Sequence, residues 1–395
     1  MSQLLGEATR RSQRYAFALS VLAAGVVSSS RVAAGQGSSA GYIRADSSRV
    51  YYEECGQGVP LVLLHDGLMH SATWDGVWSE LCRKFHVLRY DRRGMGRSDQ
   101  PKIPFLPTED LSALLADRHL EHATLIGSSS GAGLAVDYAF RHPDRVDRLI
   151  LIGPVVHGMT SSQYFLDRGA RNSAPLAKGD VSSAARNWAD DRFQIAGPNA
   201  KAREELYRAL VAYPQNLTYS ASLELRFAVP AAARLGEIRA PTLILVGESD
   251  IADVHAYAGA IELGVWGSVR EIVVGAGHLV QLEQPAWLVN RITAFITATP
   301  VVSVGSARLQ SLAGTYTPVL YGRPGEFVVR EDRLVARVAT ERDLSLFAAN
   351  DSTFYALGWD GVHFVFHRDS LGRGTRVQIT SAREPAHSAL RTPPT

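Results

Sequence analysis

The chain has 395 residues, of which 46% are hydrophobic and 20% are charged, and its 41 Lys and Arg residues nearly balance its 39 Asp and Glu residues. This composition excludes a disordered, collagen-like or multi-span membrane chain, and the balanced charge does not indicate a nucleic-acid partner. The length suits one large domain and a smaller one.

Cysteine occurs only at Cys55 and Cys82. Two cysteines exclude a disulfide framework and a cysteine-rich zinc site. A single bridge between them and two free thiols both remain open.

Residues 1–34 have the pattern of an export signal. Three arginines between residues 10 and 14 precede a charge-free stretch over residues 15–30, and small residues at 32–34 offer a cleavage site. The apolar stretch is shorter than the roughly 20 residues that cross a bilayer, so no stable membrane span is expected. The sequence therefore predicts export to the bacterial periplasm or secretion. Arg10-Arg11 leaves the twin-arginine route open, and the alternatives are an uncleaved anchor and a disordered basic leader.

From residue 42 onward, short β-branched runs alternate with amphipathic stretches, a pattern typical of a mostly parallel sheet between two layers of helices. The expected buried strands are residues 60–65, 85–91, 123–128, 148–153, 241–247 and 270–274. The expected helices are residues 74–84, 108–119, 130–141 and 285–297. We therefore predict an α/β domain with a doubly wound sheet over residues 35–298.

The alternation is interrupted at residues 159–237, where helical patterns and aromatic residues predict a cap inserted between two strands. After residue 298, short strands separated by turn-forming pairs predict a small antiparallel β-domain over residues 303–382. Its expected strands are residues 327–330, 333–338, 344–348, 353–357, 362–368 and 376–380. Residues 383–395, with three prolines and no periodicity, are expected to be disordered.

The segment Gly127-Ser128-Ser129-Ser130-Gly131 lies between an expected strand and an expected helix. A sharp turn at this point lifts the central side chain out of the sheet, and small flanking residues let the strand and helix pack closely. The amino terminus of the helix also favours negative charge beside the serine. Ser129 is therefore the candidate nucleophile.

A nucleophilic serine needs a base, and the base needs an acid that orients it. His278 and Asp250 each follow an expected strand, at the strand ends where ligands of open α/β sheets bind. The chain order Ser129, Asp250, His278 is the one expected for this kind of nucleophile turn. Glu248 and Asp253 lie in the same loop as Asp250 and are the alternative acids.

Acyl transfer also needs hydrogen-bond donors for the oxyanion. The backbone N–H of Ser130 is one predicted donor, and Gly67, in the loop after the strand at residues 60–65, is the other, with Leu68 as its alternative. We expect His65 and Asp66 to organise that loop. The chemistry requires neither a cofactor nor a metal ion.

Together these motifs resemble the α/β-hydrolase superfamily over about residues 42–298. The resemblance rests on His65-Asp66-Gly67, Trp74-Asp75, the D-x-R-G-x-G-x-S segment from Asp91 to Ser98, the turn from Gly127 to Gly131, Gly247 to Asp250, and Gly277-His278 with Glu283 and Pro285. It implies that the cap lines the substrate pocket and that the arginines of the Asp91 to Ser98 segment are parts of a structural turn rather than an anion site. Asp66 replaces a glycine that is usual in the family, and Ser128 replaces a frequent histidine.

The smaller domain is less informative. Its segment from Leu312 to Tyr316 and the hairpins after it are similar to the β-domain appended to some β-lactamase-like serine hydrolases.

We therefore expect a serine hydrolase that cleaves a small-molecule carboxylic ester, lactone or thioester through an acyl-enzyme. A perhydrolase or cofactor-free haloperoxidase and a C–C bond hydrolase would carry the same triad. A non-catalytic ligand-binding protein on this fold is the alternative from another class. The sequence makes no prediction of oligomeric state.

Overall fold

The computed structural model describes residues 38–320, 323–330, 333–338, 343–357, 362–380 and 386–393. The predicted export signal at residues 1–34 lies outside the described residues. No helix within the described ranges has the length and apolar character needed to cross a membrane.

A sheet of eight strands forms the centre of the larger domain, in the order β1-β2-β4-β3-β5-β6-β7-β8. The strands are β1 (Ser39–Ala45), β2 (Ser48–Cys55), β3 (Pro60–Leu64), β4 (His86–Tyr90), β5 (Ala123–Ser128), β6 (Val146–Ile152), β7 (Thr242–Gly247) and β8 (Val269–Val273). β2 pairs antiparallel with β1 and β4, and every other neighbouring pair is parallel. The strands from β3 to β8 agree with the predicted ones, whereas β1 and β2 were not anticipated.

Two apolar cores lie on opposite faces of this sheet. Successive residues of β3 alternate between them, with Leu64 in one core and Leu63 in the other. The helices that complete the first core are α2 (Pro107–Asp117), α3 (Ser130–Arg141) and α7 (Ala252–Gly264). Those that complete the second are α1 (Asp75–Cys82) and α9 (Pro285–Ala298). The larger domain is thus a doubly wound α/β fold.

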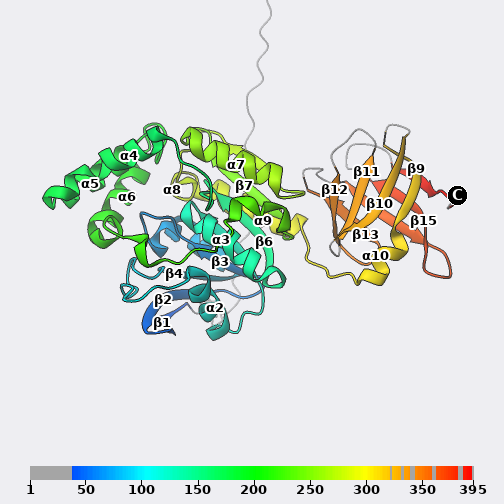
Figure 1. The fold of residues 1–395 in the computed structure, drawn as a ribbon, viewed down its shortest axis with the longest axis horizontal. Helices are drawn as coiled ribbons and strands as arrows, with labels where there is room; N and C mark the ends of the chain where they lie inside the picture. The colour runs from blue at the N-terminus through cyan, green and yellow to red at the C-terminus, as the bar shows by residue number, and fades with distance from the viewer. Residues whose placement is uncertain are drawn as a thin grey trace, which may run out of the picture. The chain divides into compact units, whose positions relative to one another are not determined.

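The segment between β6 and β7 is helical and contains α4 (Gln163–Ser173), α5 (Val181–Asp190) and α6 (Ala200–Ala212), with α5 packed against both of the others (Figure 1). The apolar faces of α5 and α6 form a separate core with Trp188 and Leu206. Met69 and Leu279 belong to the same core. Since these two residues follow Gly67 and His278 closely, the helical segment packs directly on both predicted site loops.

The smaller domain is a closed antiparallel barrel of eight strands (Figure 1). The strands are β9 (Gly314–Leu320), β10 (Arg323–Arg330), β11 (Arg333–Val338), β12 (Leu344–Ala348), β13 (Thr353–Ala356), β14 (His363–Arg368), β15 (Gly374–Thr380) and β16 (His387–Arg391). Its core includes Phe327, Phe354 and Phe364. The helix α10 (Ser306–Leu312) contributes Leu309 and Leu312 to the same core.

The expectation that residues 383–395 are disordered is wrong for β16. This strand pairs with β15 and β9 and closes the barrel. Closure satisfies backbone groups that two edge strands would otherwise leave unpaired. Only Ala389 of the strand is buried, so its sequence carries no apolar periodicity.

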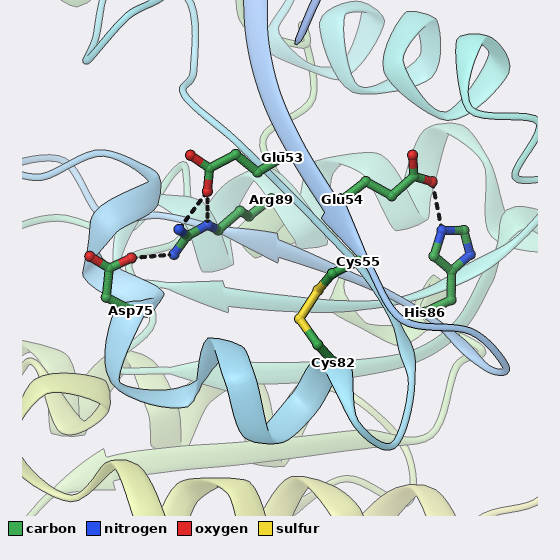
Figure 2. Close-up of a disulfide and its surroundings, with 7 residues drawn as sticks. All are labelled: Glu53, Glu54, Cys55, Asp75, Cys82, His86 and Arg89. Atoms are coloured by element: carbon green, nitrogen blue, oxygen red, sulfur yellow. Dashed lines mark hydrogen bonds and ion pairs between the residues drawn. A yellow bond between two sulfur atoms is a disulfide. The ribbon is translucent and has the colours of Figure 1, made fainter. Parts of the chain in front are cut away.

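Cys55 at the end of β2 and Cys82 at the end of α1 form a disulfide (Figure 2). Both cysteines are buried. In the same region Arg89 donates to Glu53 Oε2 and Asp75 Oδ1, each at 2.6 Å (Figure 2). The bridge and these ion pairs both link the antiparallel edge of the sheet to α1.

Removing the disulfide should destabilise the chain. The bridge joins residues 27 positions apart, and a loop of that size stabilises a fold by about 3.5 kcal/mol in the chain-entropy model. We expect the Cys55→Ala/Cys82→Ala variant to lose roughly this free energy of unfolding in urea titrations. A reductant should lower the unfolding midpoint of the wild type and leave that of the variant unchanged; equal midpoints without reductant would contradict the prediction.

Candidate active site

Ser129 lies at the junction of β5 and α3 in a strained conformation, with φ 54° and ψ −117°. Its N–H donates to Ile152 O at 2.8 Å. A Cβ at Gly127 would lie 2.5 Å from Ala132 N, and one at Gly131 would lie 2.3 Å from Leu64 O. The turn therefore requires glycine on both sides of the serine, in agreement with the motif.

His278 meets Asp250 beyond the ends of β8 and β7. The distance from His278 Nδ1 to Asp250 Oδ2 is 2.8 Å, and both residues are buried. With Asp250 accepting from Nδ1–H, Nε2 is the nitrogen that can accept a proton. The alternative acids bond elsewhere, Glu248 to Gly275 N and Asp253 to Ser162.

Gly153 connects the serine to the His–Asp pair. It directly follows Ile152, the acceptor for Ser129 N–H, and its own φ is +50°. A Cβ at Gly153 would lie 2.9 Å from His278 Nδ1 and 3.2 Å from Asp250 Oδ2. Among the described residues the Ser129 hydroxyl forms no hydrogen bond. Gly153 was not identified from the sequence. It could have been noticed as a glycine that directly follows β6, the strand next to β5.

The two predicted oxyanion donors are adjacent, since a Cβ at Gly67 would lie 3.3 Å from Ser130 Oγ. Ser130 is the first residue of α3, where helix N–H groups have no intrahelical acceptor. The alternative donor, Leu68 N–H, is engaged by Asp66 Oδ1 at 2.7 Å, and Met69 N–H donates to the same oxygen. Asp66 thus organises this loop, as expected.

The segment from Asp91 to Ser98 is mostly structural. Asp91 accepts hydrogen bonds from the backbone N–H groups of Ser71 and Arg97, and Ser98 Oγ donates to Asp91 O. Arg93 is fully buried and ion-paired with Asp110. Arg92 differs, because its Nη1 donates to Ser130 Oγ at 2.9 Å. Its side chain therefore reaches the residue next to the candidate nucleophile.

Glu283 fastens the loop that carries His278. One carboxylate oxygen accepts from Gly277 N and the other from Ala196 N in the helical insertion, both at 2.6 Å. Burial raises the pKa of Glu283 to about 7, against the opposing effect of these two donors. In the sequence, Glu283 was noted only as part of the family resemblance, without a role of its own.

Electrostatics favour the charged form of His278. Burial of the imidazole lowers its pKa, but the charge of Asp250 and the hydrogen bond to it outweigh burial. The charge of Arg168 also lowers the pKa of His278, and the charge of Asp66 also raises it. The net result is a pKa of His278 above its ordinary value, which suits a group that must hold a proton transiently.

Residues 59–285 match the model of a family described as the alpha/beta hydrolase fold. The chain belongs to this family, and its homologues include proteins named as an esterase, a putative non-heme chloroperoxidase and a 2-hydroxymuconate semialdehyde hydrolase.

An uncharacterised protein of Mycobacterium tuberculosis is 26% identical over 294 residues, covering 69% of this chain and 83% of the relative. A pimeloyl-[acyl-carrier protein] methyl ester esterase of Nitrosomonas europaea is 27% identical over 218 residues, covering 51% of this chain and 81% of the relative. Among solved structures, a thermophilic esterase of Thermogutta terrifontis aligns with a TM-score of 0.56 at 22% identity, covering 66% of this chain and 98% of the other. These similarities establish the fold of the chain. The reaction has to be inferred from the residues of the site.

The raised pKa of His278 can be tested directly. In an NMR titration of the imidazole signals we expect the His278 ring to titrate above its ordinary value of about 6.5. Asp250→Asn removes the carboxylate charge and leaves a weaker, neutral acceptor for Nδ1–H, so the pKa of His278 should fall. Glu248→Gln, in the same loop, is the matched control and should leave the pKa in place. A wild-type pKa below 6.5 would contradict the prediction.

A side chain at Gly153 should separate the serine from the His–Asp pair. Gly153→Ala adds a Cβ that overlaps His278 and also strains a residue at positive φ. Since displacement by about 1 Å can cost a hundredfold in rate, we expect about that loss in the reactivity of Ser129 toward a fluorophosphonate.

Gly197→Ala is the matched control, because Gly197 has φ +51° and its Cβ would contact nothing within 4 Å. Equal losses in the two variants would assign the effect to backbone strain and contradict the steric argument.

Proposed function

We propose that the protein is a serine hydrolase that cleaves a carboxylic ester, or a lactone or thioester, of a small molecule. The observation that carries this proposal is the placement of Ser129 on a strained strand-to-helix turn, with the hydrogen-bonded His278–Asp250 pair across Gly153. Membership of the hydrolase family supports it.

In the proposed reaction Ser129 Oγ attacks the ester carbonyl carbon while His278 Nε2 takes the hydroxyl proton. The carbonyl oxygen becomes an oxyanion that accepts from the N–H groups of Gly67 and Ser130. The alcohol leaves with the proton from His278, which completes the acyl-enzyme. Water then attacks the acyl-enzyme, with His278 again taking the proton and returning it to Ser129 Oγ, and the acid is released. Asp250 keeps the imidazole in the required tautomer throughout.

Export from the cytoplasm is part of the proposal. The amino-terminal pattern supports it, and so does the disulfide between Cys55 and Cys82, since disulfides persist mainly in oxidising compartments. The proposed binding partner is the small-molecule substrate, and no nucleic-acid partner is proposed.

Active-site labelling tests the function. A fluorophosphonate should add to a single peptide of the purified chain, the one with Ser129, because an activated serine attacks phosphorus. Labelling should vanish in Ser129→Ala and slow about a hundredfold or more in His278→Ala, which lacks the base. Ser79→Ala, at an exposed serine of α1, is the control and should label like the wild type.

Absence of labelling in a folded sample would overturn the hydrolase proposal and favour the ligand-binding alternative. With labelling established, release of 4-nitrophenol from short- and medium-chain 4-nitrophenyl esters measures turnover. Formation of a peracid from hydrogen peroxide and a carboxylic acid is then measured beside ester hydrolysis, and the comparison of the two rates separates an esterase from a perhydrolase.

A further inference from the structure

A pocket borders Ser130, the residue that follows the candidate nucleophile. It has about 590 Å³ of empty space, part of which is open to solvent. Its wall combines Arg92 and Arg93, the start of α2, one face of α3 and residues 224–227 of the helical insertion. The pocket thus lies next to the turn that carries Ser129.

Three buried polar groups in the wall have no hydrogen-bond partner among the residues that the structure describes. They are the hydroxyl of Tyr90, Nη1 of Arg93 and the hydroxyl of Thr108. Unpaired buried polar groups are costly, so they are normally matched by a bound molecule or by water. All three groups belong to residues that line this one pocket, which gives it a polar wall.

Arg92 brings a positive charge to the same wall. Its Nη1 donates to Ser130 Oγ at 2.9 Å, and its Nη2 approaches Met95 Sδ at 3.6 Å. A guanidinium carries five N–H donors and no acceptor. Within the described part of the chain Arg92 forms no ion pair, so most of its donors are available to a ligand.

The acidic residues of the wall already have partners. These pairs are Asp110 with Arg93, Asp137 with His157, and Glu224 with Arg226. These carboxylates therefore bond to groups other than Arg92, and the guanidinium of Arg92 has no carboxylate partner among the described residues. Arg92 is therefore the group of the wall that favours a negatively charged, oxygen-rich ligand.

We propose that this pocket binds a carboxylate of the substrate, with Arg92 as the cation and Arg93 Nη1 and the hydroxyls of Tyr90 and Thr108 as further donors. The inference rests on the proposed function and narrows its substrate to an ester that carries an ionised carboxyl group. Leu134, Phe105 and Phe227 line the pocket as well, and they suit an apolar chain between the ester and the carboxylate. Guanidinium groups match carboxylates in geometry as well as charge.

Two pairs of esters test this specificity. Mono-4-nitrophenyl adipate and 4-nitrophenyl hexanoate have acyl chains of equal length and differ in the terminal carboxylate. 4-Carboxyphenyl acetate and phenyl acetate place the same difference on the alcohol side. We expect the wild type to have a higher kcat/KM for the charged ester than for the neutral ester of one pair. Arg92→Gln should lower this charged-to-neutral ratio of kcat/KM about ten- to a hundredfold.

Arg145→Gln is the matched control. Arg145 is also half buried and donates to backbone carbonyls, but it lies outside the pocket. The control should keep the wild-type ratio, and Arg92→Lys should recover part of the preference. Thermal unfolding shows whether Arg92→Gln is folded. If the wild type prefers the neutral ester in both pairs, or if the ratios of Arg92→Gln stay within about twofold of wild type, the proposal is overturned.

A binding experiment separates this proposal from the hydrolase proposal, because it needs no turnover. The Ser129→Ala chain should bind monomethyl adipate more tightly than methyl hexanoate in calorimetric titrations, since only the former has a free carboxylate, and Arg92→Gln in that background should abolish the difference. Equal affinities, or a crystal structure of Ser129→Ala soaked in monomethyl adipate that shows only water in the pocket, would overturn the carboxylate site even if Ser129 reacts with the fluorophosphonate.

Discussion

The turn from β5 into α3 leaves no space for a side chain at Gly127 or Gly131, and this steric constraint positions the rest of the site. Strand and helix meet at backbone contact, so Ser129 must adopt φ 54°, a conformation that costs a non-glycine residue roughly 1–3 kcal/mol. Its N–H bond to Ile152 O ties the turn to β6. Because β6 is followed by β7 and β8 in the sheet, Gly153, Asp250 and His278 are brought to the same edge as the serine.

The segment from Asp91 to Ser98 follows β4 at the same edge of the sheet, and hydrogen bonds and an ion pair hold it in place. Hydrogen bonds to Asp91 from Ser71 and Arg97 hold the backbone, and the buried pair of Arg93 with Asp110 anchors it to α2. With its neighbours fixed in this way, Arg92 is held beside Ser130. The family resemblance implied structural roles for these arginines. That interpretation fits Arg93 and Arg97, while the position of Arg92 gives it access to the pocket.

The strands β3 to β7 were predictable because most of their residues are buried and they appear as short apolar runs. β8 is an edge strand and only partly buried, and its β-branched residues gave the prediction. β1, at the edge of the sheet, and β2 beside it bury mainly alternate residues, and β16 buries a single residue, so neither pattern stands out in the sequence. The site motifs could likewise be read locally. The choice of Asp250 over Glu248 and the contacts of Gly153 depend on how neighbouring loops face each other, which spacing along the chain does not encode.

Glu283 couples the helical insertion to the chemistry through its charge. As a carboxylate it accepts from Gly277 and Ala196 and so joins the insertion to the loop that carries His278. Burial opposes that charge and raises its pKa to about 7, so protonation weakens the link as the pH falls through neutrality. His278, whose pKa is also raised, loses its capacity as a base in the same direction. As the pH rises Glu283 ionises and His278 becomes neutral, so the bonds that join the insertion to the His278 loop and the availability of the base depend on pH in the same direction.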